Sequence, residues 1–213
     1  MLKILNVFIS YFGIITIIVF LFLIIFGSIL DPRSQLLFRE ISYFISPYMS
    51  GKKITIPLFQ LYNLTLIVFS LGLSLRMHNI FAKFGSLSLA LSGVVGIILI
   101  WFPMAPPHMP QTIDGLLHVF TAFIMSFCIV TAILFFGKAF EHMANLAWLS
   151  QYSFGISLIL FLSTIVTGLF AVFQDSSLVG LTEKLSLGAF FFWILLVAVG
   201  ILRSDKRVNY NLP

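Results

Sequence analysis

Asp114 and His118 are the two residues of this chain whose types and spacing best suit acid–base chemistry. They are four positions apart, so on a helix their side chains share one face and lie one turn apart. A carboxylate can orient an imidazole for proton transfer or for metal binding. The same spacing also fits a structural role, in which Asp114 caps a helix N-terminus and His118 hydrogen-bonds to a neighbouring helix.

A second group of polar residues could bind a ligand, and it consists of Gln60, Asn63, His108, Glu183 and Lys184. The two amides are one turn apart and could line a cavity or form hydrogen bonds between helices. Glu183 and Lys184 could bind a polar headgroup or form an ion pair at a helix start. The sequence lacks the His and Cys spacings of a zinc site and the glycine motifs of nucleotide sites. We therefore expect no metal and no cofactor.

The composition indicates that these residues lie in a membrane. Hydrophobic residues make up 60% of the chain, charged residues only 9%, and the mean hydropathy is +1.12. Soluble domains have roughly 25% charged residues, so a soluble fold is excluded. The 12 Lys and Arg residues lie scattered at the ends of apolar stretches, which is typical of membrane anchoring and not of nucleic-acid binding. A lone cysteine, Cys128, excludes a disulfide framework.

Uncharged apolar stretches recur along the whole chain, at residues 5–30, 54–75, 84–102, 115–137, 152–174 and 185–202. Each is long enough to cross about 30 Å of hydrocarbon as a helix. Only a helix satisfies all backbone polar groups within one such segment. The first stretch is about twice as long as the apolar region of a signal peptide, so we expect it to be retained. The predicted fold is all-α, with six transmembrane helices in one domain over residues 1–213.

Two local patterns add to this architecture. Asp31 and Pro32 suit the start of a helix, and apolar residues then recur at helical spacing at Leu37, Ile41, Phe44, Ile45 and Tyr48, opposite Arg39, Glu40 and Ser42. This predicts a short amphipathic helix at the membrane interface, either as a lid or as packing over the bundle end. In the third stretch, Ser88, Ser92 and Gly96 form a small-residue stripe that favours close approach of a neighbouring helix.

Six crossings place the first, third and fifth connections on one side of the membrane. His108, Asp114, His118, Glu183 and Lys184 therefore lie toward the same side, together with the start of the second stretch. The distribution of Lys and Arg favours cytoplasmic N- and C-termini, so this side faces outward. We expect one outward-facing polar pocket.

Three short motifs follow one another along most of the chain. Phe102-Pro103 precedes a proline-rich loop and Gly115-Leu-Leu-His118, and Trp148-x-x-x-Tyr152-Ser153 follows. The last motif is Gly180-Leu181-x-Glu183-Lys184, with Trp193 further along. In these motifs and their order, the chain resembles the DUF998 family of prokaryotic membrane proteins, which is itself similar to the eukaryotic Frag1/DRAM/Sfk1 group. The resemblance implies the six-helix fold and gives no activity, because the function of the family is unknown.

Two positions depart from the family pattern. Ala105 stands where an acidic residue is usual after Phe-Pro, and Lys184 stands where an arginine is usual. An arginine binds anions through two parallel hydrogen bonds and a lysine does not, so these changes bear on any chemistry that the two positions perform.

The sequence favours a protein of the prokaryotic inner membrane whose pocket binds a lipid headgroup or another small amphiphile. One competing hypothesis is a membrane enzyme that uses Asp114 and His118 on a lipid substrate. The other is a noncatalytic subunit that docks onto a membrane-protein partner. Membrane lipid is the expected partner in the first two cases, and no nucleic acid is expected in any.

Overall fold

A computed structural model describes residues 2–31, 40–104, 112–172 and 176–208. Its regular elements are all helical, as predicted: α1 (Leu2–Leu30), α2 (Ile41–Phe44), α3 (Lys52–Arg76), α4 (Ile80–Leu99), α5 (Ile113–Glu141), α6 (Trp148–Val172) and α7 (Ser176–Val208). Within the described residues, six of these helices are long and apolar enough to cross a membrane. The predicted all-α fold with six spans is confirmed.

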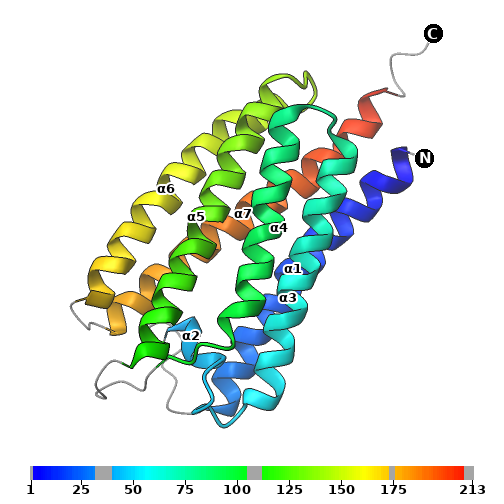
Figure 1. Cartoon of the computed structure of the whole chain (residues 1–213). Helices are drawn as coiled ribbons and strands as arrows, with labels where there is room; N and C mark the ends of the chain where they lie inside the picture. The colour runs from blue at the N-terminus through cyan, green and yellow to red at the C-terminus, as the bar shows by residue number, and fades with distance from the viewer. Residues whose placement is uncertain (1, 32–39, 105–111, 173–175, 209–213) are drawn as a thin grey trace.

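The long helices form a closed ring. Neighbours in this ring are α1 and α3, α3 and α4, α4 and α5, α5 and α6, α6 and α7, and finally α7 and α1. Figure 1 shows the helices running alongside one another, with both ends of the chain at one end of the bundle and α2 at the other. We refer to these as the terminal end and the α2 end.

Small residues on α4 let its neighbours approach closely, as the stripe in the sequence predicted. Ser88 donates its hydroxyl hydrogen to the Cys128 carbonyl oxygen on α5 at 2.9 Å. On the other side of α4, Gly96 packs directly against the Asn63 side chain of α3, where a β-carbon would collide with the amide oxygen. A helix with larger residues at these positions could not sit between α3 and α5.

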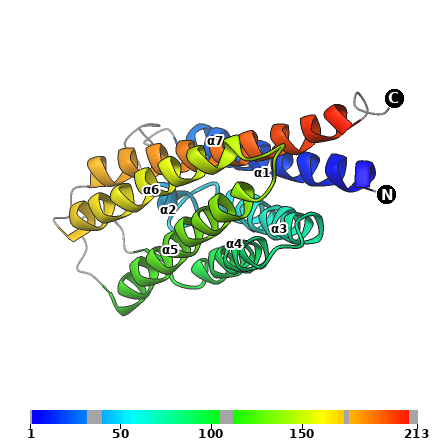
Figure 2. The ribbon, with the colours of Figure 1, turned by 90° about the horizontal axis from the view of Figure 1, so that it is seen from above.

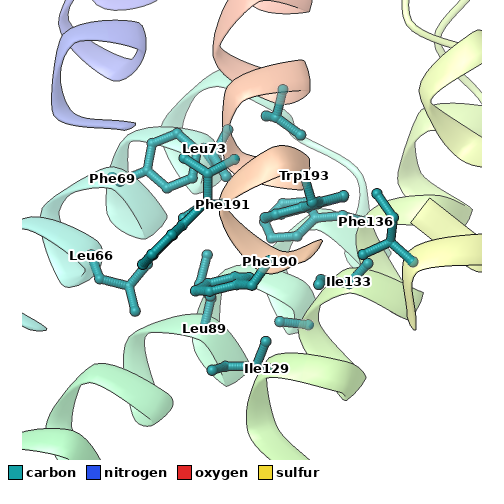
Figure 3. Close-up of a cluster of buried hydrophobic side chains, with 14 of the residues drawn as sticks. Leu66, Phe69, Leu73, Leu89, Ile129, Ile133, Phe136, Phe190, Phe191 and Trp193 are labelled. Carbon is teal, nitrogen blue, oxygen red and sulfur yellow. The ribbon is translucent and has the colours of Figure 1, made fainter. Parts of the chain in front are cut away.

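Buried side chains fill the ring toward the terminal end, and we call those labelled in Figure 3, which include Ile129, Phe136, Phe190 and Trp193, the aromatic cluster. Trp193 is fully buried at its centre, with its ring centroid 5.6 Å from that of Phe136 and 6.3 Å from that of Phe190. The indole N–H donates to the Ser153 hydroxyl of α6 at 2.9 Å. The one polar atom of the largest core residue is thus satisfied, as burial away from water requires.

The interfacial element α2 is a single turn in the described part of the chain. Ile41 and Phe44 are buried, and Thr55 donates to the Phe44 carbonyl oxygen at 2.5 Å. The predicted helix start at Pro32, together with Leu37 and Arg39, lies outside the described residues. Glu40, which was predicted opposite the apolar residues, is itself buried, with 8% of its surface exposed.

The helix bounds differ from the predicted stretches at some of their ends. α4 ends at Leu99, ahead of Pro103, where 102 was predicted. At charged ends the helices instead extend past the prediction: α4 begins at Ile80 where 84 was predicted, and α7 begins at Ser176 where 185 was predicted. At these ends the predicted limits were set at charged residues. A helix can continue past a charged residue, because a long charged side chain can reach out to the membrane–water interface. As a result, Glu183 and Lys184 lie about two turns inside α7 and not at its start.

Candidate functional site

A cavity of about 210 Å³ lies inside the ring toward the α2 end, and residues from all seven helices line it. Most of the lining is apolar, with Phe20 from α1 and Phe59 from α3 among its members. Ile129 and Phe190 belong both to this lining and to the aromatic cluster of Figure 3, so that cluster closes the cavity toward the terminal end.

Polar side chains interrupt the apolar lining, and they are Glu40, Ser42, Tyr62, His118, Ser126, Thr164, Thr167, Glu183 and Ser186. Two of the hydroxyls are engaged between α6 and α7. Thr167 donates to Thr182 at 2.8 Å, and Ser163 and Ser186 share a hydrogen bond of 2.5 Å. These bonds join α6 to α7 along one wall of the cavity.

His118 is hydrogen-bonded to Phe102, which lies three residues after the end of α4. Its Nδ1 lies 2.7 Å from the Phe102 carbonyl oxygen, which can only accept, so Nδ1 carries the hydrogen. In the neutral ring, Nε2 is then an acceptor, and no residue in the described part of the chain hydrogen-bonds to it. The side chain is 4% exposed and lines the cavity. The imidazole is therefore oriented, with one nitrogen left for a ligand.

Glu183 connects α7 to α2. One carboxylate oxygen accepts a hydrogen bond of 2.7 Å from the Ile41 backbone N–H, one of the donors that a helix start leaves without an intrahelical partner. The other oxygen receives no hydrogen bond from the described residues. Lys184 interacts electrostatically with both Glu183 and Glu40. The carboxylate thus anchors α2 with one oxygen and offers the other to the cavity.

Tyr62 is the lining residue that the sequence interpretation missed. Its ring packs against Phe20 at 4.7 Å and Phe191 at 6.2 Å between centroids, and the residue is 2% exposed. Its hydroxyl has no hydrogen-bond partner among the residues that the structure describes. Tyr62 is ten residues from the start of α3, about 15 Å along the helix. Tyrosine usually lies at the membrane interface. A tyrosine predicted this deep in a membrane-spanning stretch was therefore the sequence feature that could have identified Tyr62 as a candidate site residue.

The structure brings only some of the predicted site residues together. Of the seven, His118 and Glu183 line the cavity, and Lys184 is next to Glu183. Asp114 is exposed and makes no hydrogen bond to His118, whose partner is Phe102 instead. His108 lies outside the described residues. The catalytic role of Asp114 and His118 stays a prediction, without the hydrogen-bonded pair that motivated it.

The two amides of the second span do not line the cavity. Gln60 is exposed on the outside of α3. Asn63 is fully buried against α4, where its Nδ2 donates to the Phe59 carbonyl oxygen at 2.8 Å and its Oδ1 abuts Gly96. Helical rotation explains both positions, because α3 turns Tyr62 to the cavity and so turns Gln60 away from it. Within the described residues, no three His, Cys, Asp or Glu side chains gather closely enough to hold a metal.

Residues of the sequence motifs meet across helices in this structure. The His118 bond to Phe102 joins the two parts of the first motif, and the Trp193 bond to Ser153 joins the second motif to the last. The family model described as "Protein of unknown function (DUF998)" matches residues 14–200. The chain belongs to the DUF998 family. No curated protein and no solved structure gives a significant match. DUF998 membership covers α1 from its second half through most of α7, and so includes all the elements that build the cavity.

Proposed function

We propose that this DUF998 protein binds the headgroup region of a membrane amphiphile in the cavity. The observation that carries the proposal is a set of three residues that line one apolar cavity with hydrogen-bonding capacity to spare: the buried Tyr62 and His118 and the half-buried Glu183. Each of the three keeps one polar atom that no described residue binds. A ligand in the cavity could hydrogen-bond to all three of these atoms at once.

The chemistry of these groups indicates the kind of headgroup. The free oxygen of Glu183 and Nε2 of His118 accept hydrogen bonds, so the ligand must donate them. A hydroxyl or a primary ammonium group does so, whereas a quaternary ammonium group has no N–H. The Tyr62 hydroxyl can either donate or accept, and it can therefore bind an ester or phosphate oxygen beside the donor.

The remaining lining suits the apolar part of such a molecule. Ile45, directly after α2, Val130 of α5 and Leu160 of α6 present only aliphatic surface to the cavity. A site with one polar corner in an apolar wall matches an amphiphile better than it matches a polar metabolite.

The experiment measures which lipids the purified full-length protein retains. The protein is reconstituted in vesicles of phosphatidylcholine with equal minor amounts of phosphatidylethanolamine and diacylglycerol, then extracted, and its bound lipid is quantified by mass spectrometry. We expect enrichment of the two lipids that donate hydrogen bonds. Tyr62→Phe and Glu183→Gln should each lower this enrichment about fivefold, the equivalent of one lost hydrogen bond of about 1 kcal/mol.

Matched controls separate the cavity from general effects. Tyr152→Phe and Glu141→Gln make the same chemical changes at positions that do not line the cavity, since Tyr152 is 52% exposed and Glu141 pairs with Lys138 at 3.1 Å. Both controls should retain lipid like the unchanged protein. Bound lipid of bulk composition, unaltered by the two cavity variants, would contradict the proposal.

A further inference from the structure

We infer that the ligand is a lipid that enters the cavity sideways from the membrane, between α5 and α6, and that its tails stay in the bilayer. This inference rests on the proposed function and specifies both the source of the ligand and its route. It follows from four observations: how the α2 end is held, where α5 and α6 separate, which lining residues are exposed, and how small the cavity is.

The α2 segment covers the cavity at the α2 end of the bundle. Ile41, Ser42 and Ile45 all belong to the lining. The segment is tied to three other parts of the chain, through Ile41 N–H to Glu183, Tyr43 hydroxyl to Asp31 at 2.6 Å, and Thr55 hydroxyl to the Phe44 carbonyl oxygen. A ligand that entered past α2 would have to break these bonds.

Helices α5 and α6 are in contact near the terminal end and diverge toward the α2 end, as Figures 1 and 2 both show. A β-carbon added at Gly137 of α5 would lie 3.1 Å from the Phe154 ring of α6. Near the other end of α6, a β-carbon added at Gly168 would meet no atom within 4 Å, although Gly168 lines the cavity. The wall between these two helices is therefore open at Gly168.

Exposed residues mark the edges of this opening. Val119 and Phe123 of α5 line the cavity and are nevertheless 38% and 53% exposed. Phe123 is ten residues from the start of α5, about 15 Å along the helix. Since the hydrocarbon core is about 30 Å thick, this edge faces lipid tails and not water.

The volume of the cavity limits how much of a lipid it can hold. Pockets that enclose a drug-sized ligand measure about 300–1,000 Å³, and this cavity measures about 210 Å³. A headgroup with its glycerol fits, but two acyl chains do not. An opening to the hydrocarbon lets the chains remain in the bilayer, whereas a small water-borne amphiphile would have no need of it.

The test uses two glycines of α6 that differ in one respect. A β-carbon at Gly155 or at Gly168 meets nothing within 4 Å, but only Gly168 lines the cavity. The full-length protein is placed in phosphatidylethanolamine vesicles that contain a small fraction of the same lipid with a diazirine in one acyl chain. After illumination, the labelled residues are mapped by mass spectrometry, and retained phosphatidylethanolamine is measured as above.

In the unchanged protein, adducts should concentrate beside the opening, around Val119 and Phe123. Gly168→Trp should reduce these adducts and the retained lipid at least fivefold, and Gly155→Trp should change neither. Adducts spread evenly over all lipid-facing helices would overturn the inference, and this result needs no variant. Unchanged retention in a folded Gly168→Trp protein would overturn it as well.

The outcome also separates this inference from the proposed function. If Tyr62→Phe and Glu183→Gln lower retention but Gly168→Trp does not, the cavity binds lipid that arrives by another route. If the two cavity variants have no effect, the proposed function itself fails.

Discussion

The two ends of the bundle differ in how their inward-facing polar groups are used. Toward the terminal end, three polar pairs connect helices: Trp193 with Ser153, Ser10 with the Ala198 carbonyl oxygen at 2.8 Å, and Arg76 with Asn6 at 2.8 Å. Toward the α2 end, Tyr62, His118 and Glu183 keep hydrogen-bonding capacity that the described residues do not use. The terminal end is closely packed and supports the bundle, whereas the α2 end surrounds a cavity.

The same pair of helices forms both environments. Gly137 lets the Phe154 ring lie against α5, so that α5 and α6 pack closely there. Gly168 has no such partner, and the two helices separate around it. Because the aromatic cluster holds α5 and α7 at one end, the opening at the other end need not loosen the whole ring. This comparison leads to four predictions.

The largest effect is expected at the centre of the packed end. Trp193→Ala removes a fully buried side chain and leaves a void against Phe136 and Phe190, which should lower the free energy of unfolding by about 3 kcal/mol. Unfolding in mixed detergent micelles, followed by circular dichroism, measures this change. Trp101→Ala is the control, since Trp101 is 72% exposed, and its stability should stay near that of the unchanged protein. Equal stability of the two variants would refute a supporting role for the cluster.

The second prediction compares the same substitution, glycine to alanine, at a closely packed position and at an open one. Gly96→Ala drives a methyl group into the Asn63 side chain and should destabilise the protein by about 1–3 kcal/mol. Gly168→Ala adds the same methyl where no atom lies within 4 Å, and should leave stability unchanged or raise it by up to about 1 kcal/mol, because alanine favours the helix more than glycine does. The same micelle unfolding assay compares the two. A destabilised Gly168→Ala protein would mean that α5 and α6 close together there.

The architecture was predictable from the sequence because its causes are local. Long uncharged stretches can cross a membrane only as helices, and the small residues Ser88, Ser92 and Gly96 predict a helix that its neighbours approach closely. Helix ends were less predictable, because the criterion was charge and a helix continues through charges such as Glu183. The single turn α2 depends on partners outside itself: Asp31 and Thr55 lie 12 and 11 residues from the residues they bind, and Glu183 lies 142 residues from Ile41.

The site was only partly predictable for a related reason. The alternation of connections placed His118 and Glu183 on one side, but which residues of a helix face inward depends on its rotation. Asn63 and Gln60 were chosen for their amide groups, whereas Tyr62 between them faces the cavity. A hydrogen bond between helices, such as that from His118 to Phe102, requires the packing of α4 and α5 to be known.

The third prediction concerns the connection between the cavity and α2. Glu183→Ala removes the acceptor of the Ile41 N–H and should raise amide hydrogen exchange in α2 about tenfold, equivalent to about 1.5 kcal/mol of local stability. Exchange in the packed region around Trp193 should not change. Glu183→Gln keeps a carbonyl acceptor and should hold α2 nearly as well, although it replaces the other oxygen with a donor. Rapid exchange in both variants would mean that charge, and not the hydrogen bond, holds α2.

The smallest effect on stability is expected at Tyr62. Because folding should hardly depend on this hydroxyl, its removal directly tests whether the α2 end serves ligand binding. Tyr62→Phe keeps the ring against Phe20 and Phe191 and removes a hydroxyl that no described residue binds, so the free energy of unfolding should change by less than about 0.5 kcal/mol. Removing a hydroxyl that is already paired, as in Ser10→Ala, should cost about 1 kcal/mol, because its bond to Ala198 is lost. If Tyr62→Phe instead costs as much as Ser10→Ala without any bound lipid, the hydroxyl has a structural partner and the α2 end is not built for a ligand. A stable Tyr62→Phe protein that loses lipid separates binding from folding at one atom.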